Sequence, residues 1–209
     1  MKDITSAALD EPNDVALSSA VLAVFISELS LHCLGAEHAY TAMVMAVSER
    51  RSDGTRSASQ IQKIFVQIDA FLFHVAMISQ NLWPGGEPQE HERTEASDTI
   101  AGVLAALRSE RGAQLREALG PEVSLLQDLG LWEYFVHQDA RIEIWAMSNA
   151  GDGSAIVAMD VTQSLDVAEA RPAVRRLDPI SLSYCFCGKE FDLPAIAAVV
   201  SWLGRTLHG

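Results

Sequence analysis

Apolar residues recur at intervals of three and four along most of the chain, which is the spacing of one face of an α-helix. The first such pattern runs from Leu17 to Glu49 and predicts one long helix. The second begins after Ser57 or Ser59, either of which suits a helix N-cap, and ends at about Leu82. Its apolar stripe is wide, so we expect this helix to lie deep in the core.

Two further helical patterns follow. The third covers Ser97 to Leu119, with Gly112 as a point where the helix is expected to weaken or split, and Gly120-Pro121 stops it. The fourth starts near Glu122 and runs to about Met147. Four helices joined by short connections predict an antiparallel bundle over residues 15–147 or so.

The period of the pattern changes after residue 150. A short β-branched run from Ala155 to Val161 predicts a strand, whereas Leu165 to Asp178 is mixed and predicts no element. Ser181 to Phe186 alternates between apolar and polar positions, and a turn at Gly188-Lys189 leads into Glu190 to Leu193. These features predict a β-hairpin.

The chain ends in another helical pattern, Pro194 to Leu207, for which Asp192 or Leu193 is the expected start because proline suits the first turn. The predicted fold class is therefore mostly α: an antiparallel four-helix bundle with a C-terminal β-hairpin and a final helix. No linker or repeat interrupts the sequence, so we expect a single domain over residues 1–209, with the small β element and closing helix at about 155–207.

The net charge of the chain disfavours two classes of binding partner. The formal net charge is −13, and such an excess of acid works against non-specific binding to nucleic acid or anionic lipid. The apolar stretches are interrupted by charged residues and histidines too often for a membrane span. The polar, acidic N-terminus has no signal-peptide pattern, which predicts a cytoplasmic protein with no membrane contact.

Three cysteines occur, and an odd number without a signal peptide fits a reducing compartment. Cys185 and Cys187 are spaced so that a strand would place both side chains on one face. They could form half of a metal site, or they could be two small apolar residues. Because no second pair of cysteines or histidines lies nearby in the sequence, the apolar interpretation is favoured.

Glutamate and histidine recur at helical spacing in two places, Glu28 with His32 and Glu133 with His137. Two such pairs facing each other would hold a metal ion. Solvated or core-edge polar residues are the favoured explanation, because the second and third helices add few inward-facing carboxylates. His74 lies within the apolar stripe of the second helix, so we expect a partly buried imidazole with a hydrogen-bond partner. No cofactor and no metal ligand set is assigned.

The most informative segment spans Leu131 to Trp145. Glu133, His137 and Arg141 are spaced four apart, so on one helix they form a line of acid, imidazole and guanidinium. This line suits an acid–base site, because histidine titrates near neutral pH, and it suits a solvent-facing ladder of ion pairs. Signatures of P-loops, dinucleotide-binding folds, serine hydrolases and zinc proteases do not occur.

This segment resembles the signature helix of HEPN-like proteins, helical bundles of bacterial toxin–antitoxin and phage-defence systems, a subset of which carries L-R-N-x-F-E-H-F-D-E-R-L-x-x-W. The stretch from Ile78 to Pro84 is similar to their I-S-K-x-L-W-P, and the tail from Leu177 to Leu193 resembles their hairpin and final helix. The matching positions in the signature segment are Leu131, Phe135, His137, Asp139, Arg141 and Trp145.

The resemblance implies a dimer, because active members are metal-independent ribonucleases whose R-x-x-x-x-H motifs meet in a cleft between two protomers. His137 is retained, but Trp132 stands in place of the arginine and Glu133 in place of a polar asparagine. Tryptophan lacks the charged fork that binds phosphate. In an active protein the resemblance implies His137 as general base and Arg141 as the replacement cation, with Asp139, Glu133 and Tyr134 beside them.

The sequence thus leads to one principal hypothesis and two alternatives. The principal one is a catalytically degenerate HEPN-like protein that acts as a dimerising interaction or regulatory subunit, in a bacterial defence or toxin–antitoxin context, through the face bearing the fourth helix. A protein partner is compatible with this role. The alternatives are a metal-independent endoribonuclease that uses His137 and binds RNA, and a helical bundle that binds a metal or a small molecule.

Overall fold

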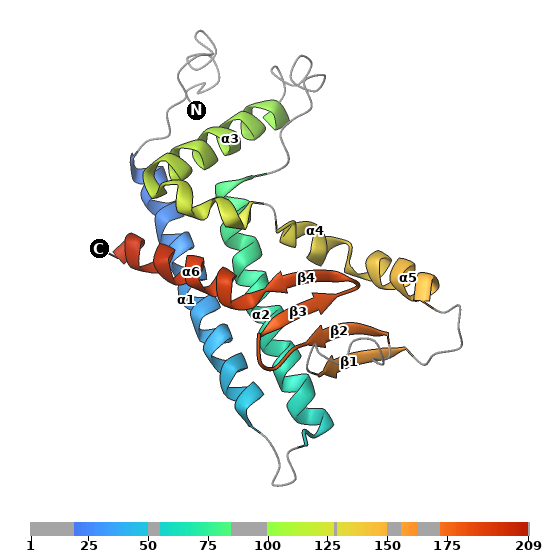
Figure 1. Cartoon of the computed structure of the whole chain (residues 1–209). Helices are drawn as coiled ribbons and strands as arrows, with labels where there is room; N and C mark the ends of the chain where they lie inside the picture. The colour runs from blue at the N-terminus through green and yellow to red at the C-terminus, as the bar shows by residue number, and fades with distance from the viewer. Residues whose placement is uncertain are drawn as a thin grey trace, which may run out of the picture.

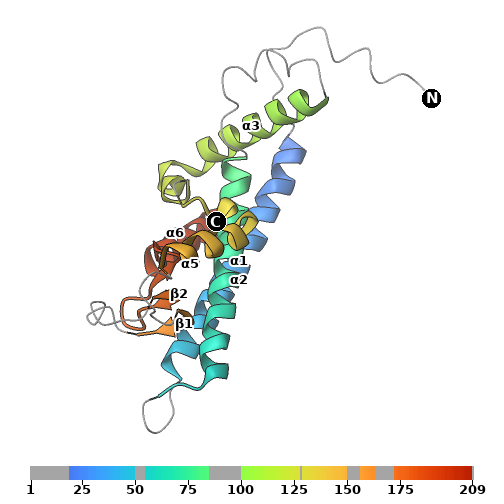
Figure 2. The same cartoon turned by 90° about the vertical axis from the view of Figure 1, so that its right-hand side faces the viewer.

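Two long antiparallel helices, α1 (Ser19–Ser48) and α2 (Ala58–Leu82), form one layer of the molecule (Figures 1 and 2). The computed structural model describes residues 19–49, 55–84, 100–127, 129–149, 156–162 and 172–208. These residues are mostly helical and carry a small sheet on the C-terminal side, so the prediction of a mostly α protein is confirmed.

Local capping explains how α2 begins beside the end of α1. The Ser57 hydroxyl accepts a hydrogen bond from the backbone of Gln60, and the Gln60 side chain accepts one from the backbone of Ser57, which completes a capping box. Arg56 Nη2 donates to the carbonyl oxygen of Val47 at 2.6 Å and so ties the start of α2 to the end of α1.

Helix α3 (Ile100–Leu119) crosses the end of the α1–α2 pair (Figure 1). It runs unbroken past Gly112, so the expected split does not occur. Gly112 is buried where α3 meets the end of α2, and a Cβ atom there would lie 2.6 Å from the carbonyl oxygen of Leu82. The glycine therefore permits a close approach between the helices, which Arg116 strengthens by donating to the same carbonyl.

The opposite layer consists of α6 (Leu193–His208), which crosses α1, and a sheet beside it (Figures 1 and 2). Asp192 caps α6, because its Oδ1 accepts a hydrogen bond from the backbone N–H of Ala195 at 3.0 Å. The predicted helix start is therefore confirmed. The inner face of α6 buries Ile196, Val200 and Leu203.

The sheet has four strands in the order β1-β2-β3-β4, where β1 and β2 are parallel and the other pairs antiparallel. The predicted strand and hairpin are present as β1 (Val157–Val161), β3 (Ser183–Phe186) and β4 (Lys189–Asp192). The strand β2 (Ala173–Leu177) lies in the stretch for which no element was predicted.

The turn of the hairpin is one residue earlier than predicted. Cys187 and Gly188 are its two central residues, with φ of 48° and 84°. Two consecutive positive φ angles match the twist of the flanking strands. Cys187 therefore lies in the turn, not in a strand beside Cys185.

The prediction of one helix from Glu122 to Met147 is wrong. The segment forms a 3-10 helix η1 (Pro121–Leu126), a short helix α4 (Leu131–Val136) and a separate helix α5 (Gln138–Asn149). His137 lies between α4 and α5.

A backbone conformation and one contact explain the break before α4. Gly130 has a φ of 56°, a left-handed conformation that a helix interior does not contain. Lys189 Nζ donates to the carbonyl oxygen of Leu129 at 2.5 Å and so fixes this bend to the start of β4. Nothing in the structure explains the second break, at His137.

The core is continuous from the α1–α2 layer to the sheet. Phe65 and Phe71 of α2 lie in it together with Tyr134 of α4 and inward-facing aromatic residues of the sheet. The largest fully buried side chains include Leu29, Met43, Ile64, Ile68, Phe71, Leu72, Ile78, Leu82, Leu115, Tyr134, Tyr184 and Phe186.

By length and composition alone, α1 and α2 are each apolar enough to cross a membrane. In the most apolar window, 17% of the α1 residues and 44% of the α2 residues are buried inside the protein. Core helices of water-soluble proteins pass the same test, so these helices do not assign a membrane location.

Candidate functional site: the α4–α5 segment and the hairpin beneath it

The α4–α5 segment carries the residues predicted from the signature. His137 is exposed between the two helices, and Asp139 is exposed in the first turn of α5. The backbone N–H of Arg141 donates to the carbonyl oxygen of His137 at 3.0 Å, so these residues remain one helical turn apart. The line from Glu133 to Arg141 does not lie on one helix, and the side chains of Trp132 and Glu133 fall outside the described structure.

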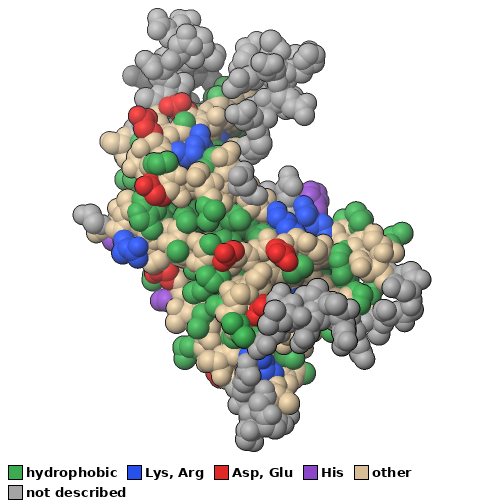
Figure 3. Space-filling model, in the orientation of Figure 1, with side chains coloured by type: hydrophobic (Ala, Val, Ile, Leu, Met, Phe, Trp, Pro, Cys, Tyr) green, Lys and Arg blue, Asp and Glu red, His purple; other side chains and the backbone are tan. Residues whose placement is uncertain are grey.

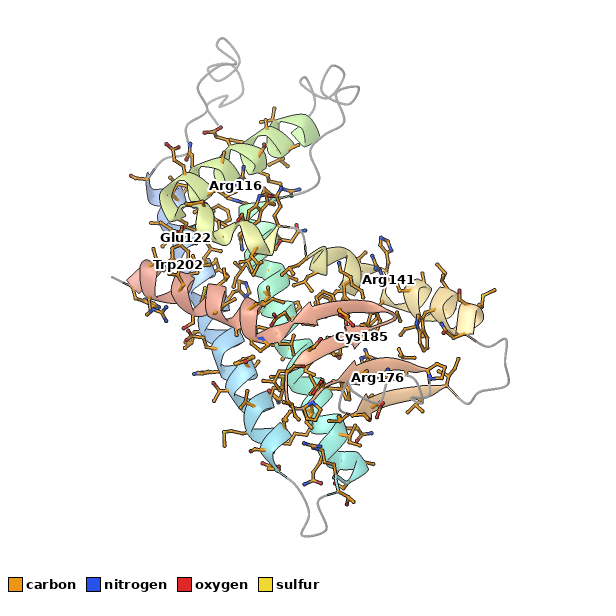
Figure 4. The ribbon with its side chains drawn as sticks, viewed as in Figure 1. Arg116, Glu122, Arg141, Arg176, Cys185 and Trp202 are labelled. Atoms are coloured by element: carbon orange, nitrogen blue, oxygen red, sulfur yellow. The ribbon has the colours of Figure 1, made fainter. Side chains whose placement is uncertain are left out.

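Arg141 is half-buried and lies next to the β3–β4 hairpin (Figure 4). Burial raises the pKa of the Cys187 thiol, while the positive charges of Arg175 and Arg141 lower it. The positive charge of Arg141 therefore favours the ionised form of the Cys187 thiol in the turn between β3 and β4. In Figure 3, Lys or Arg atoms lie beside a histidine in this region.

Tyr134 is the predicted site residue that the structure places in the core. Its hydroxyl is 2.9 Å from the hydroxyl of Tyr184 on β3, and the two form a buried hydrogen bond. Burial raises the pKa of Tyr134 to about 12. Tyr134 also packs edge-on against Phe135 and Phe191. This tyrosine thus positions α4 on the sheet and does not reach solvent.

Two charged residues that the sequence did not single out lie at the edge of this aromatic cluster. Arg175 Nη2 is 3.7 Å from Asp69 Oδ2, and its guanidinium lies 5.3 Å from the centre of the Phe186 ring. Burial raises the pKa of Asp69, while Arg175 lowers it. Asp69 Oδ1 and Arg175 Nε are buried without a hydrogen-bond partner. The sequence signals were Asp69 within the apolar stripe of α2 and Arg175 among the arginines of the stretch from Leu165 to Asp178.

A separate hollow of about 410 Å³ lies where α6 crosses α1 and α2. Phe71 and Pro194 contribute apolar surface, and Glu37, Tyr40 and Ser201 contribute polar groups. Burial, together with the charge of Asp192, raises the pKa of Tyr40. An apolar hollow with a few polar groups is the general form of a small-molecule site.

The histidines expected in isolation come together in the seam between α1 and α2. His32 Nδ1 is 3.1 Å from His74 Nδ1. The expectation that His74 is partly buried and hydrogen-bonded is therefore confirmed. Within the residues that the structure describes, no three His, Cys, Asp or Glu side chains form a group able to hold a metal ion.

The chain matches no protein-family model, no curated protein and no solved structure.

Proposed function

We propose that this chain is a catalytically degenerate HEPN-like protein, a divergent form of the four-helix bundle, that acts in the cytoplasm as a dimerising interaction or regulatory subunit in a bacterial defence or toxin–antitoxin context. One observation carries the dimerisation: an apolar stripe on α5 that faces solvent.

The stripe consists of Ile144 and Met147, which are spaced three apart and so share one face of α5, together with Val136 at the end of α4. Ile144 is 66% exposed and Met147 80% exposed. The opposite side of α5 packs on the core through Ile142 and Trp145. A helix with apolar residues on both its inner and its solvent-facing sides is typical of an interface that a second chain covers.

The position of the stripe supports the same proposal. α5 lies at the outer end of the α4–α5 segment, away from α3 (Figure 1), and hydrophobic atoms are visible at that end in Figure 3. This is the segment through which the resemblance implies pairing. A two-fold arrangement would bring the two stripes together, because symmetric dimers use the same patch on both copies.

The loss of catalysis is supported by two features of the segment. Trp132 replaces the phosphate-binding arginine. Tyr134 is locked in the core by Tyr184 and so cannot contact a substrate. The net charge of −13 further disfavours RNA unless a local basic cluster offsets it.

The test is the oligomeric state, measured by light scattering coupled to size exclusion over a range of concentrations. We expect a dimer for the unchanged protein and a monomer for the double variant Ile144→Asp with Met147→Asp. The matched control is Val24→Asp with Leu31→Asp on α1, which replaces residues that are 58% and 59% exposed. Circular dichroism verifies that each variant is folded.

The proposal fails if the unchanged protein is a monomer at every concentration. Its assignment to α5 fails if the α1 control dissociates the dimer while the α5 variant leaves it intact.

One observation favours the ribonuclease alternative. The imidazole of His137 is exposed, as a general base must be, and Arg141 follows it by one helical turn. In this alternative Arg141, or an arginine of a second copy, would stabilise the phosphate charge.

A further inference from the structure

His32 of α1 and His74 of α2 point their Nδ1 atoms at each other. The two atoms are 3.1 Å apart, and the ring centres are 5.4 Å apart with the planes tilted by 50°. One ring must carry its proton on Nδ1 and the other must offer a lone pair there, because two N–H groups or two lone pairs would repel. Both residues are half-buried and remain accessible from solvent.

The packing around His74 leaves room for its ring. Gly35 lies one turn after His32 on α1, and a Cβ atom at Gly35 would be 2.5 Å from the Cε1 and Nε2 atoms of His74. Any larger residue at position 35 would push the imidazole out of this place. Glycine in the middle of a long helix is less stable than alanine, so the position of the ring is obtained at the expense of helix stability.

The surroundings of the pair lower the pKa of both imidazoles. Burial lowers the pKa of His32, while Glu28 opposes that shift. Burial and the neighbouring His32 lower the pKa of His74. The carboxylate of Glu28, one helical turn before His32, places negative charge near the pair.

We propose that His32 and His74 form a two-imidazole site for a divalent transition-metal ion of the Zn²⁺ class. Zinc–nitrogen bonds of about 2.05 Å in a tetrahedral site place two ligand nitrogens about 3.3 Å apart and the ring centres about 5.2 Å apart. The observed separations, 3.1 Å and 5.4 Å, differ from these by only a few tenths of an ångström.

Binding requires the two rings to swivel, not the helices to move. In the ion-free pair the Nδ1 atoms point at each other, whereas in the site both lone pairs point at the ion. The ring that carries its proton on Nδ1 loses it to solvent and takes one up on Nε2, so both imidazoles stay neutral and no net proton is released.

The chemistry of the donors selects the ion. Imidazole suits Zn²⁺, Cu²⁺ and Ni²⁺, whereas Mg²⁺ prefers oxygen ligands. Because no third metal ligand groups with the pair among the described residues, water completes the coordination. This site does not depend on dimerisation or on the ancestry of the chain.

The test is calorimetric titration of Zn²⁺ into the full chain without a histidine tag. We expect one Zn²⁺ per chain and no binding of Mg²⁺. His32→Ala and His74→Asn should each weaken Zn²⁺ binding at least tenfold, since even the loss of an outer hydrogen-bond partner costs a metal site 10-fold or more. His74→Asn retains a polar side chain in the seam and so limits damage to the fold.

His38→Ala is the matched control, because His38 is an exposed histidine on the same helix. It should leave Zn²⁺ binding unchanged. No Zn²⁺ binding by the unchanged protein overturns the proposal, as does binding that survives both His32→Ala and His74→Asn. Loss of binding in His38→Ala alone assigns the ion to another site and also overturns it.

Discussion

The buried hydrogen bond between Tyr134 and Tyr184 makes the sharpest quantitative prediction. Both hydroxyls lie in the core, 2.9 Å apart, and each is the partner of the other. Tyr134→Phe removes one hydroxyl and leaves the other buried without a partner. Such a loss costs about 1–3 kcal/mol in the free energy of unfolding.

The double variant, with phenylalanine at both positions, should behave differently. It removes both hydroxyls, so no polar group is left unsatisfied, and replacement of both partners is close to neutral. The rings stay in place, including the contact of Tyr134 with Phe186 at 4.5 Å between centres. We therefore expect the double variant to lose less stability than the sum of the two single variants, by about 2–3 kcal/mol.

The assay is equilibrium unfolding in urea, followed by far-ultraviolet circular dichroism for the unchanged protein, both single variants and the double variant. For a chain of this length, a change of 1 kcal/mol shifts the melting temperature by roughly 2–4 °C, which gives an independent measure. Strictly additive losses would refute the reasoning, because they would mean that the two hydroxyls do not depend on each other.

Three further outcomes are expected. The pKa of Tyr134 is raised to about 12, so the stability gained by keeping this hydroxyl protonated is complete below pH 10 and is lost as the pH rises from 10 to about 12. Across that range the urea midpoint of unfolding should therefore fall less steeply for Tyr134→Phe than for the unchanged protein. Asp192→Ala removes the cap of α6 and should cost about 1 kcal/mol in urea unfolding, whereas Asp192→Asn should cost less because asparagine also caps well. RNA incubated with the unchanged protein and with His137→Ala should remain intact in both cases; cleavage that is lost in His137→Ala would support the ribonuclease alternative instead.

The helices that could be predicted from the sequence are those whose ends are set locally. Ser57 caps α2 and Asp192 caps α6 with side chains that lie within three residues of their partners. Gly120-Pro121 ends α3 in the same local way. Caps and stops of this kind are visible in the sequence because they involve neighbours in the chain.

The features that escaped prediction depend on distant contacts. The bend before α4 is held by Lys189 and the carbonyl oxygen of Leu129, which are 60 residues apart. Strand β2 contains Arg175 and Arg176, which argue against a strand until Asp69 and Asp160 are seen to pair with them. The His32–His74 pair joins two helices whose histidines have no shared sequence pattern.

The α4–α5 segment departs from the proposed ribonuclease ancestry in its backbone as well as in its residues. In the HEPN-like motif that this segment resembles, the arginine and the histidine are five residues apart, but here α4 ends at Val136 and His137 follows outside it. An arginine placed at position 132 would therefore not by itself reproduce that motif on a continuous helix. The residues beyond the break, Ile144 and Met147, face solvent. The break at His137 and the exposed apolar stripe thus occur in one short segment, which is the combination that the proposed role as a degenerate HEPN-like interaction subunit requires.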